Sequence, residues 1–219
     1  MEIENLSPGD IERISMQIIE SELGDTSHLS ESEKLVVKRV IHTTADFEYL
    51  NNLKFSENVV DKAKDILKKG AVIVTDTQMA FSGISKPAVQ KLGCEMHCFM
   101  SDSDVAETAK KNGTTRAVAS VDKAAEIFPD KNIIFVVGNA PTALIRICEL
   151  AERGKLSPAF VVGTPVGFVN VVQSKNMIMQ TDIPYIAAVG RKGGSTVAAA
   201  VCNALLYQVY DRKTGKIIE

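Results

Sequence analysis

Three short segments of the sequence join an apolar run to a glycine, and each could present backbone amides to an anion. They read VVGNAPTAL at 136–144, VVGTPVGF at 161–168 and AVGRKGGST at 188–196. Glycine lets the chain turn sharply after a strand, and a following helix points its free amides and positive dipole end at the loop. Glycine also occurs at such positions for packing alone. At Gly138, Gly163 and Gly190 both roles therefore stay open.

The third of these segments has the most specific chemistry. Arg191 and Lys192 come directly before Gly193, Gly194 and Ser195, at an expected helix start. Fixed cations beside free backbone amides suit carboxylates or phosphates. The residue order matches neither the G-x-x-x-x-G-K-[ST] loop of triphosphate binding nor the G-x-G-x-x-G loop of dinucleotide binding, which disfavours those two ligand classes.

A histidine next to an arginine is the second candidate for chemistry. His42 stands at the end of an expected helix in KRVIHTTADFEY, and Arg39 lies three residues earlier, on the same helix face. Histidine changes its charge near neutral pH, and a neighbouring cation favours its neutral form. A histidine at a helix end is also commonly a cap or a surface residue, so the pattern alone leaves a proton-transfer role open.

Two further features have weaker chemistry. Arg116, in NGTTRAV, is an isolated cation near a helix start, where a solvated arginine is the ordinary interpretation. Cys94 and Cys98 flank His97 in CEMHCFM, but alternation along a strand sends the cysteines to one face and the histidine to the other. Since no second ligand pair with zinc-like spacing follows, we expect no metal at this segment. A chain of this size needs no disulfides, so we expect its thiols to be reduced, and we expect no cofactor.

The elements that must position these residues fall into two groups. The first 70 residues are expected to be helical: SPGD (7–10) and the capping box SESE (30–33) are helix starts, and a third helix begins at Ser56 and stops at Gly70. From residue 71 short apolar runs alternate with helical stretches around 104–111, 116–127, 141–153 and 193–209. The apolar runs are AVIVT (71–75), CEMHCFM (94–100), IIFVV (133–137), AFVV (159–162) and YIAAV (185–189).

Such alternation predicts an α/β fold, because continuous apolar runs suit strands that are buried on both faces. We expect a single domain over 1–219, with a mainly parallel sheet of about five strands between helical layers and the N-terminal helices added to it. The polar tail at 210–219 is expected to fray.

Composition excludes several partners. The net charge of −2, the aromatic content of 5% and the lack of Trp argue against nucleic-acid binding, so any anion must be met by locally placed cations. The acidic start MEIENLSPGDIER does not resemble a signal peptide, and no apolar run approaches the ~18 residues that span a bilayer. We expect a cytoplasmic protein with no membrane partner.

Taken together, four segments resemble a known family. RVIHTTADFEY (39–49), VVGNAPTAL (136–144), GTPVGFVNVVQSK (163–175) and GRKGGSTVAAAVCNAL (190–205) are similar to motifs of the precorrin-8X methylmutases, isomerases of cobalamin biosynthesis. The similarity runs in register from ERISMQII (12–19) to Leu205. One departure is Gln173, where an acidic residue is common in the family.

The resemblance implies a reaction and a set of site residues. A methyl group moves from carbon 11 to carbon 12 in ring C of a tetrapyrrole, which converts precorrin-8 or its cobalt complex into the corresponding cobyrinate. The family's catalytic histidine falls on His42, and its substrate-contacting serine and arginine fall on Ser15 and Arg39. Other positions expected to face the substrate are Arg116, Arg191 and Lys192. The resemblance also implies a homodimer.

Within this interpretation, His42 protonates a pyrrole-type nitrogen next to ring C while cations and loop amides hold the acid arms. Two rival functions fit the same residues. One is a nucleotide- or phosphate-dependent transferase that uses the glycine loops, and the other is a non-catalytic tetrapyrrole carrier. The motifs do not encode whether the substrate carries cobalt or whether a second subunit completes the site.

Overall fold

The computed structural model describes residues 6–218, and these residues form a six-stranded sheet in the order β1-β6-β5-β4-β2-β3. All neighbouring strands are parallel except β1, which runs antiparallel to β6. The predicted mainly parallel sheet is confirmed. The strands are β1 (Leu53–Phe55), β2 (Val72–Thr75), β3 (Glu95–His97), β4 (Ile133–Val137), β5 (Phe160–Gly163) and β6 (Tyr185–Ala188).

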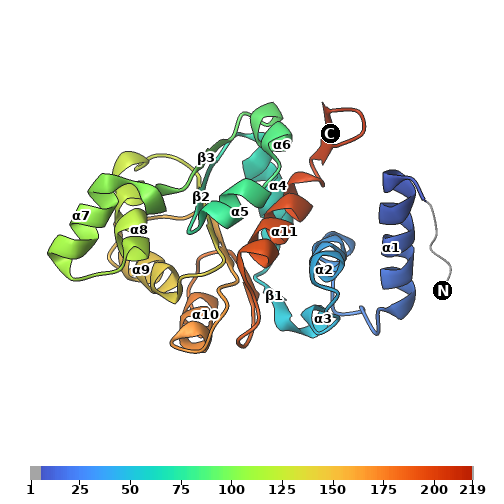
Figure 1. Cartoon of the computed structure of the whole chain (residues 1–219), viewed down its shortest axis with the longest axis horizontal. Helices are drawn as coiled ribbons and strands as arrows, with labels where there is room; N and C mark the ends of the chain where they lie inside the picture. The colour runs from blue at the N-terminus through green and yellow to red at the C-terminus, as the bar shows by residue number, and fades with distance from the viewer. Residues whose placement is uncertain (1–5, 219) are drawn as a thin grey trace.

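Helices cover both faces of the sheet. On one face, α2, α4, α5, α6 and α11 share a core with strand residues such as Ile73 and Ile134, and on the other face α7 to α10 pack on Val74 and Phe135. Figure 1 shows α7, α8 and α9 at one end of the molecule and α11, α2 and α1 toward the other. The two cores arise because successive strand residues point to opposite faces.

The helices have the following bounds: α1 (Pro8–Glu22), α2 (Glu31–Thr44), α3 (Tyr49–Asn52), α4 (Val59–Lys68), α5 (Gln78–Gly83), α6 (Lys86–Lys91), α7 (Ser103–Asn112), α8 (Arg116–Ile127), α9 (Pro141–Glu152), α10 (Val171–Met179) and α11 (Ser195–Leu206). A short 3-10 helix, η1 (Phe99–Ser101), follows β3. None of the described helices is both long and apolar enough to cross a membrane.

The order of the strands contains one reversal, between β2 and β4. The chain places β3 on one side of β2 and then returns to build β4, β5 and β6 on the other side. Ligands of such sheets bind beyond the carboxyl ends of the strands, where the order reverses. The loops after β2, β4, β5 and β6 are therefore the places where a site is expected.

The N-terminal helices begin where their capping residues predict. Ser7 accepts a hydrogen bond from the amide of Asp10, and Ser30 and Glu33 form the reciprocal capping box of α2. Glu20 of α1 binds Lys34 and Lys38 near the start and middle of α2. Because Glu12 binds Arg39, farther along α2, the two helices run antiparallel.

The structure differs from the sequence-based prediction in several elements. The helices α3, α5, α6 and α10 were not predicted. The edge strand β1 was missed, since three residues with one buried side chain give too short a pattern. The third long helix begins at Val59 and not at Ser56, behind a left-handed Asn58. The strand predicted at 94–100 covers only Glu95–His97, because η1 follows it. The helix predicted at 193–209 begins at Ser195 and ends at Leu206.

The prediction that the C-terminal tail frays is wrong. Strands β7 (Tyr210–Asp211) and β8 (Lys216–Ile217) form a hairpin, with Tyr210 buried against the main core. The Asp211 carboxylate accepts hydrogen bonds from the amide of Lys213 and the hydroxyl of Thr214, which fixes the turn. Local side-chain bonds of this kind stabilise polar turns without an apolar run to announce them.

Candidate functional site

The loop after β4 binds a carboxylate that belongs to the protein itself. Asp76, directly after β2, is buried, and its carboxylate accepts hydrogen bonds from the amides of Gly138, Asn139 and Ala140 at 2.9, 2.7 and 2.6 Å. Burial raises the pKa of this carboxyl, and the three amide bonds oppose the rise. The amides of this loop, which could have bound the oxyanion of a ligand, therefore bind the carboxylate of Asp76. Sequence reasoning missed this residue, although an acidic residue straight after a buried strand was a usable signal.

Close packing also leaves no room for a ligand at the loop after β4, where the strand order reverses. A Cβ atom on Gly138 would lie 2.7 Å from the Cα of Ser195 and 2.9 Å from the carbonyl oxygen of Gly194. The start of α11 thus packs directly on the loop after β4, and the hydroxyls of Thr77 and Ser195 lie 2.8 Å apart across the same contact. Gly138 is required for packing, so the packing role left open for this glycine is the correct one.

The loop after β6, residues 190–193, is built differently. Lys175 of α10 is fully buried, and its ammonium donates hydrogen bonds to the carbonyl oxygens of Gly190 at 2.9 Å and Lys192 at 2.7 Å. Burial lowers the pKa of Lys175 to about 8. A side chain at Gly193 would collide with the carbonyl oxygen of Thr164. The loop is therefore held from beneath by a cation and from one side by the backbone after β5.

The two basic side chains of this loop have different surroundings. Lys192 binds the carboxylates of Asp46 at 2.6 Å and Glu48 at 2.9 Å, which raise the pKa of its ammonium. Lys192 is thus a cation that is already paired within the chain. Arg191 is exposed, and its guanidinium lies 5.4 Å from the ring centre of Phe168, a residue with 81% of its surface exposed.

His42 lies in the last turn of α2 and is half-buried. The core-facing residues of α2 include Val37 and Ile41, while His42 shares with Arg39 the face that meets α1. The chain then passes through Asp46, which binds Lys192. This ion pair brings the end of α2 to the loop after β6, so the predicted catalytic histidine and the predicted anion loop lie at one edge of the sheet.

Arg39 is engaged by other residues. Its guanidinium donates to the carboxylate of Glu12 at 2.9 Å, and the same oxygen accepts a hydrogen bond from Arg212 of the hairpin at 2.5 Å. The two guanidinium carbons lie 5.5 and 4.4 Å from the ring centre of Tyr207. The Glu12 carboxylate is therefore already bound between two arginines, and one of them, Arg39, is the arginine that the family resemblance assigns to the substrate.

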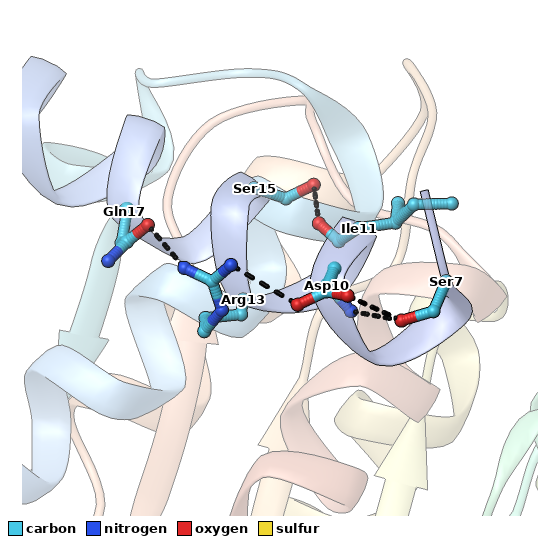
Figure 2. A network of polar contacts seen from close by, with 6 residues as sticks. All are labelled: Ser7, Asp10, Ile11, Arg13, Ser15 and Gln17. Carbon is cyan, nitrogen blue, oxygen red and sulfur yellow. Dashed lines mark hydrogen bonds and ion pairs between the residues drawn. The ribbon is translucent and has the colours of Figure 1, made fainter. Parts of the chain in front are cut away.

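Ser15 lies on the side of α1 that faces α2. It follows Glu12 by three residues and precedes the buried Ile19 by four, a spacing that places all three on one helix face. Figure 2 shows its hydroxyl donating to the carbonyl oxygen of Ile11, at 2.7 Å, apart from the contacts of Arg13 with Asp10 and Gln17. The structure thus brings Ser15, Arg39 and His42 to facing surfaces of two helices.

Arg116 lies elsewhere. It is exposed at the first turn of α8, after the capping residue Thr115, whose hydroxyl lies 2.9 Å from that of Thr142 in α9. Arg116 is therefore at the carboxyl edge of the sheet, but on the face opposite to α2. Within one chain it is not brought together with His42.

A cavity of about 610 Å³ lies at the amino edge of the sheet, away from these residues. Its walls come from the segments before β5 and β6 and from the ends of α9 and α10, with Glu152 and Asp182 among them. It contains none of the residues predicted to do chemistry. Because the sheet's chemistry is expected at the other edge, the loops there and not this cavity define the candidate site.

Three of the four cysteines, and His97, are packing residues. Cys94, Cys148 and Cys202 are buried, and burial raises the pKa of Cys148 to about 11 and of Cys202 to about 12, which keeps these thiols protonated. His97 packs against the rings of Phe99 and Phe128. Among the side chains at 6–218, no three potential ligands gather as a metal site would require.

Comparisons with known proteins give consistent matches. The family model described as precorrin-8X methylmutase matches residues 10–208. A cobalt-precorrin-8 methylmutase of Leptospira interrogans is 45% identical over 203 residues, 90% of this chain and 92% of that protein, and one of Salmonella typhimurium is 44% identical over 92% of this chain and 96% of its own. The solved precorrin-8x methyl mutase of Thermus thermophilus is 37% identical, with a TM-score of 0.82 over 90% of this chain and 95% of its own.

Proposed function

The chain belongs to the precorrin-8X methylmutase family, whose members are isomerases, and we propose that it moves a methyl group within precorrin-8 or cobalt-precorrin-8 to give the corresponding cobyrinate. The match of one family model from residue 10 to residue 208 carries this proposal. The migration is intramolecular, so the protein has to orient the macrocycle and to polarise it. Any cobalt would belong to the substrate.

We assign the proton transfer to His42. In support, its imidazole is half-buried at the end of α2, and the Asp46–Lys192 pair holds that end beside the loop after β6. A proton delivered to a pyrrole-type nitrogen next to ring C would draw electrons from the conjugated system and favour the methyl shift. General acid catalysis of this kind contributes about 10²- to 10⁴-fold.

We assign the binding of the acid arms to Ser15, Arg39, Arg116, Arg191 and Lys192. For Arg39, a substrate carboxylate would replace Glu12, which is the same chemical group at the same guanidinium. For Lys192, a substrate carboxylate would share the ammonium with Asp46 and Glu48 or displace one of them. Bound arms of this kind orient the reacting ring.

His42→Ala tests the catalytic assignment. We expect kcat to fall by about 10²- to 10⁴-fold with little change in the melting temperature, because the imidazole contributes to the reaction and not to the core. Conversion is followed by the change in absorbance of the macrocycle. The matched control is His28→Ala, at an exposed turn residue, which should leave the rate unchanged. A folded His42→Ala variant that turns over at the normal rate would remove His42 from the mechanism.

The rival functions make different predictions. Asp76 occupies the amides that a nucleotide phosphate would use at the reversal point, which removes the main support for a nucleotide-dependent transferase. A thermal-shift screen in which a nucleotide stabilises the protein and a corrinoid acid does not would restore that function. A carrier binds the product acid without converting its precursor, so turnover separates it from the enzyme.

We further propose a cytoplasmic homodimer. The family resemblance suggests the dimer, and exposed apolar side chains near the candidate site support it, namely Ile11 and Ile18 of α1 and Val166, Phe168 and Val169 of the loop after β5. Light scattering on the purified protein gives the mass, and a monomer at working concentration would contradict this proposal.

A further inference from the structure

Lys175 is an ion without a counter-ion. Its side chain is fully buried, and no carboxylate of the residues at 6–218 lies within ion-pair distance of its ammonium. The two basic residues of the loop that Lys175 holds are directed elsewhere: Lys192 binds Asp46, and Arg191 lies over the ring of Phe168. A buried charge is retained at a large free-energy penalty, so its contacts merit a functional explanation.

Two hydrogen bonds of Lys175 determine how the loop after β6 faces solvent. The ammonium binds the carbonyl oxygens of Gly190 and Lys192. In a trans peptide unit the C=O and N–H groups point in opposite directions. The N–H groups of the same two peptide units, which belong to Arg191 and Gly193, therefore point away from the buried ammonium.

No acceptor is found for these two amides among the described residues. Neither donates a hydrogen bond to another backbone group in the part of the chain that the structure describes, whereas Gly194 does, to Thr164 at 2.8 Å. Backbone N–H groups that follow one another in a turn can form a concave anion site. The ammonium beneath them adds positive charge that no protein carboxylate neutralises at ion-pair distance.

We propose that Lys175 is a positioning residue that holds the amides of Arg191 and Gly193 outward, as a binding site for one carboxylate arm of the tetrapyrrole. This inference rests on the proposed function for the identity of the anion. Lys175 itself stays beneath the loop and does not touch the substrate.

The first test is Lys175→Met, which keeps the length and apolar volume of the side chain and removes its charge and donors. We expect KM for the precorrin to rise about 10- to 100-fold with kcat changed less, because the site binds the ground state and the transition state alike. The wild type should bind the product acid more tightly than its full methyl ester, and the variant should lose most of that preference. Lys155→Met, an exposed lysine of the amino edge, is the matched control.

The second test needs no variant and applies even where Lys175→Met does not fold. Amide NMR of the wild type is recorded with and without the corrinoid product acid. We expect the N–H protons of Arg191 and Gly193 to move downfield with the acid and much less with the ester.

The outcomes separate the two proposals. A wild type that binds the product acid but never converts the precursor overturns the enzymatic function alone. An active wild type whose Arg191 and Gly193 amides do not respond to the acid, or a folded Lys175→Met variant with normal KM and normal preference for acid over ester, overturns the role of Lys175.

Discussion

The loops at 138–140 and 190–193 have the same design in sequence and opposite polarity in the structure. Each follows a buried parallel strand, contains glycine and leads toward a helix. Beneath the first loop a buried carboxylate binds three amides, and beneath the second a buried ammonium binds two carbonyls. The first loop therefore has its donors used internally, while the second turns donors outward.

This difference comes from residues distant in the chain. Asp76 lies 62 residues before Gly138, and Lys175 lies 15 residues before Gly190. The glycines allow each loop to turn, but the sign of the buried charge decides which backbone groups remain for a ligand. A glycine loop in an α/β protein is thus an anion site only where the protein supplies no anion of its own.

The largest expected effect is that of Asp76→Ala. The change leaves three amides without their acceptor, and we expect the free energy of unfolding to fall by about 3–5 kcal/mol. Urea unfolding measures this loss. Formate in excess should restore part of the stability that the variant has lost and should stabilise the wild type much less, because only the variant has an empty anion site at the loop after β4. One amide hydrogen bond can contribute less than about 1 kcal/mol, but three lost together should cost more. A total loss below about 1 kcal/mol would therefore contradict this view of the first loop.

The second effect depends on pH. The pKa of Lys175 is about 8 in the folded protein and near 10.5 in the unfolded chain, so between these values the unfolded state binds more protons. The penalty for the buried ammonium is complete below pH 8 and is relieved as the pH rises toward 10.5. Relative to Lys175→Met, the wild type should gain about 2–3 kcal/mol between pH 7 and pH 10.

Unfolding of both proteins at the two pH values gives this difference directly, and the other titrating groups cancel between them. If the difference in free energy of unfolding between the two proteins stays constant with pH, Lys175 is solvated. The loop after β6 would then have no buried charge beneath it to contrast with Asp76.

The smallest effects compare the glycines themselves. Gly138→Ala should lower the free energy of unfolding by about 2–3 kcal/mol, because its Cβ would meet the backbone of α11. Gly190→Ala should lower it by about 1 kcal/mol, because the space is open and only the positive φ of 80° is unfavourable. Thermal or urea unfolding of both variants measures the order, and equal losses would show that the first loop can move away from α11.

Much of the fold could be predicted from the sequence because its signals are local. The continuous apolar run at 133–137 coincides with β4, and the start at Arg116 coincides with that of α8. The edge strand β1 and the C-terminal hairpin carry no such pattern, since one is three residues long and the other depends on polar turn contacts.

The candidate site was less predictable because it depends on pairings across the fold. The sequence drew attention to Lys192 and Arg39, yet their partners Asp46 and Glu12 become apparent only once the helices and loops are in place. The two buried charges that decide the polarity of the loops, Asp76 and Lys175, have no distinctive motif around them. Their importance comes from burial, which periodicity indicates only for apolar residues.

Helix α1 is attached to the rest of the protein by few apolar contacts and by several ion pairs. Only Ile19 of its described side chains is buried, whereas Glu12 and Glu20 form ion pairs with four basic residues of α2 and the hairpin. Dissolved ions screen such partly exposed pairs and leave the apolar cores of the sheet almost untouched. Ser15, which we propose as a substrate contact, is therefore carried by an element whose docking responds to ionic strength.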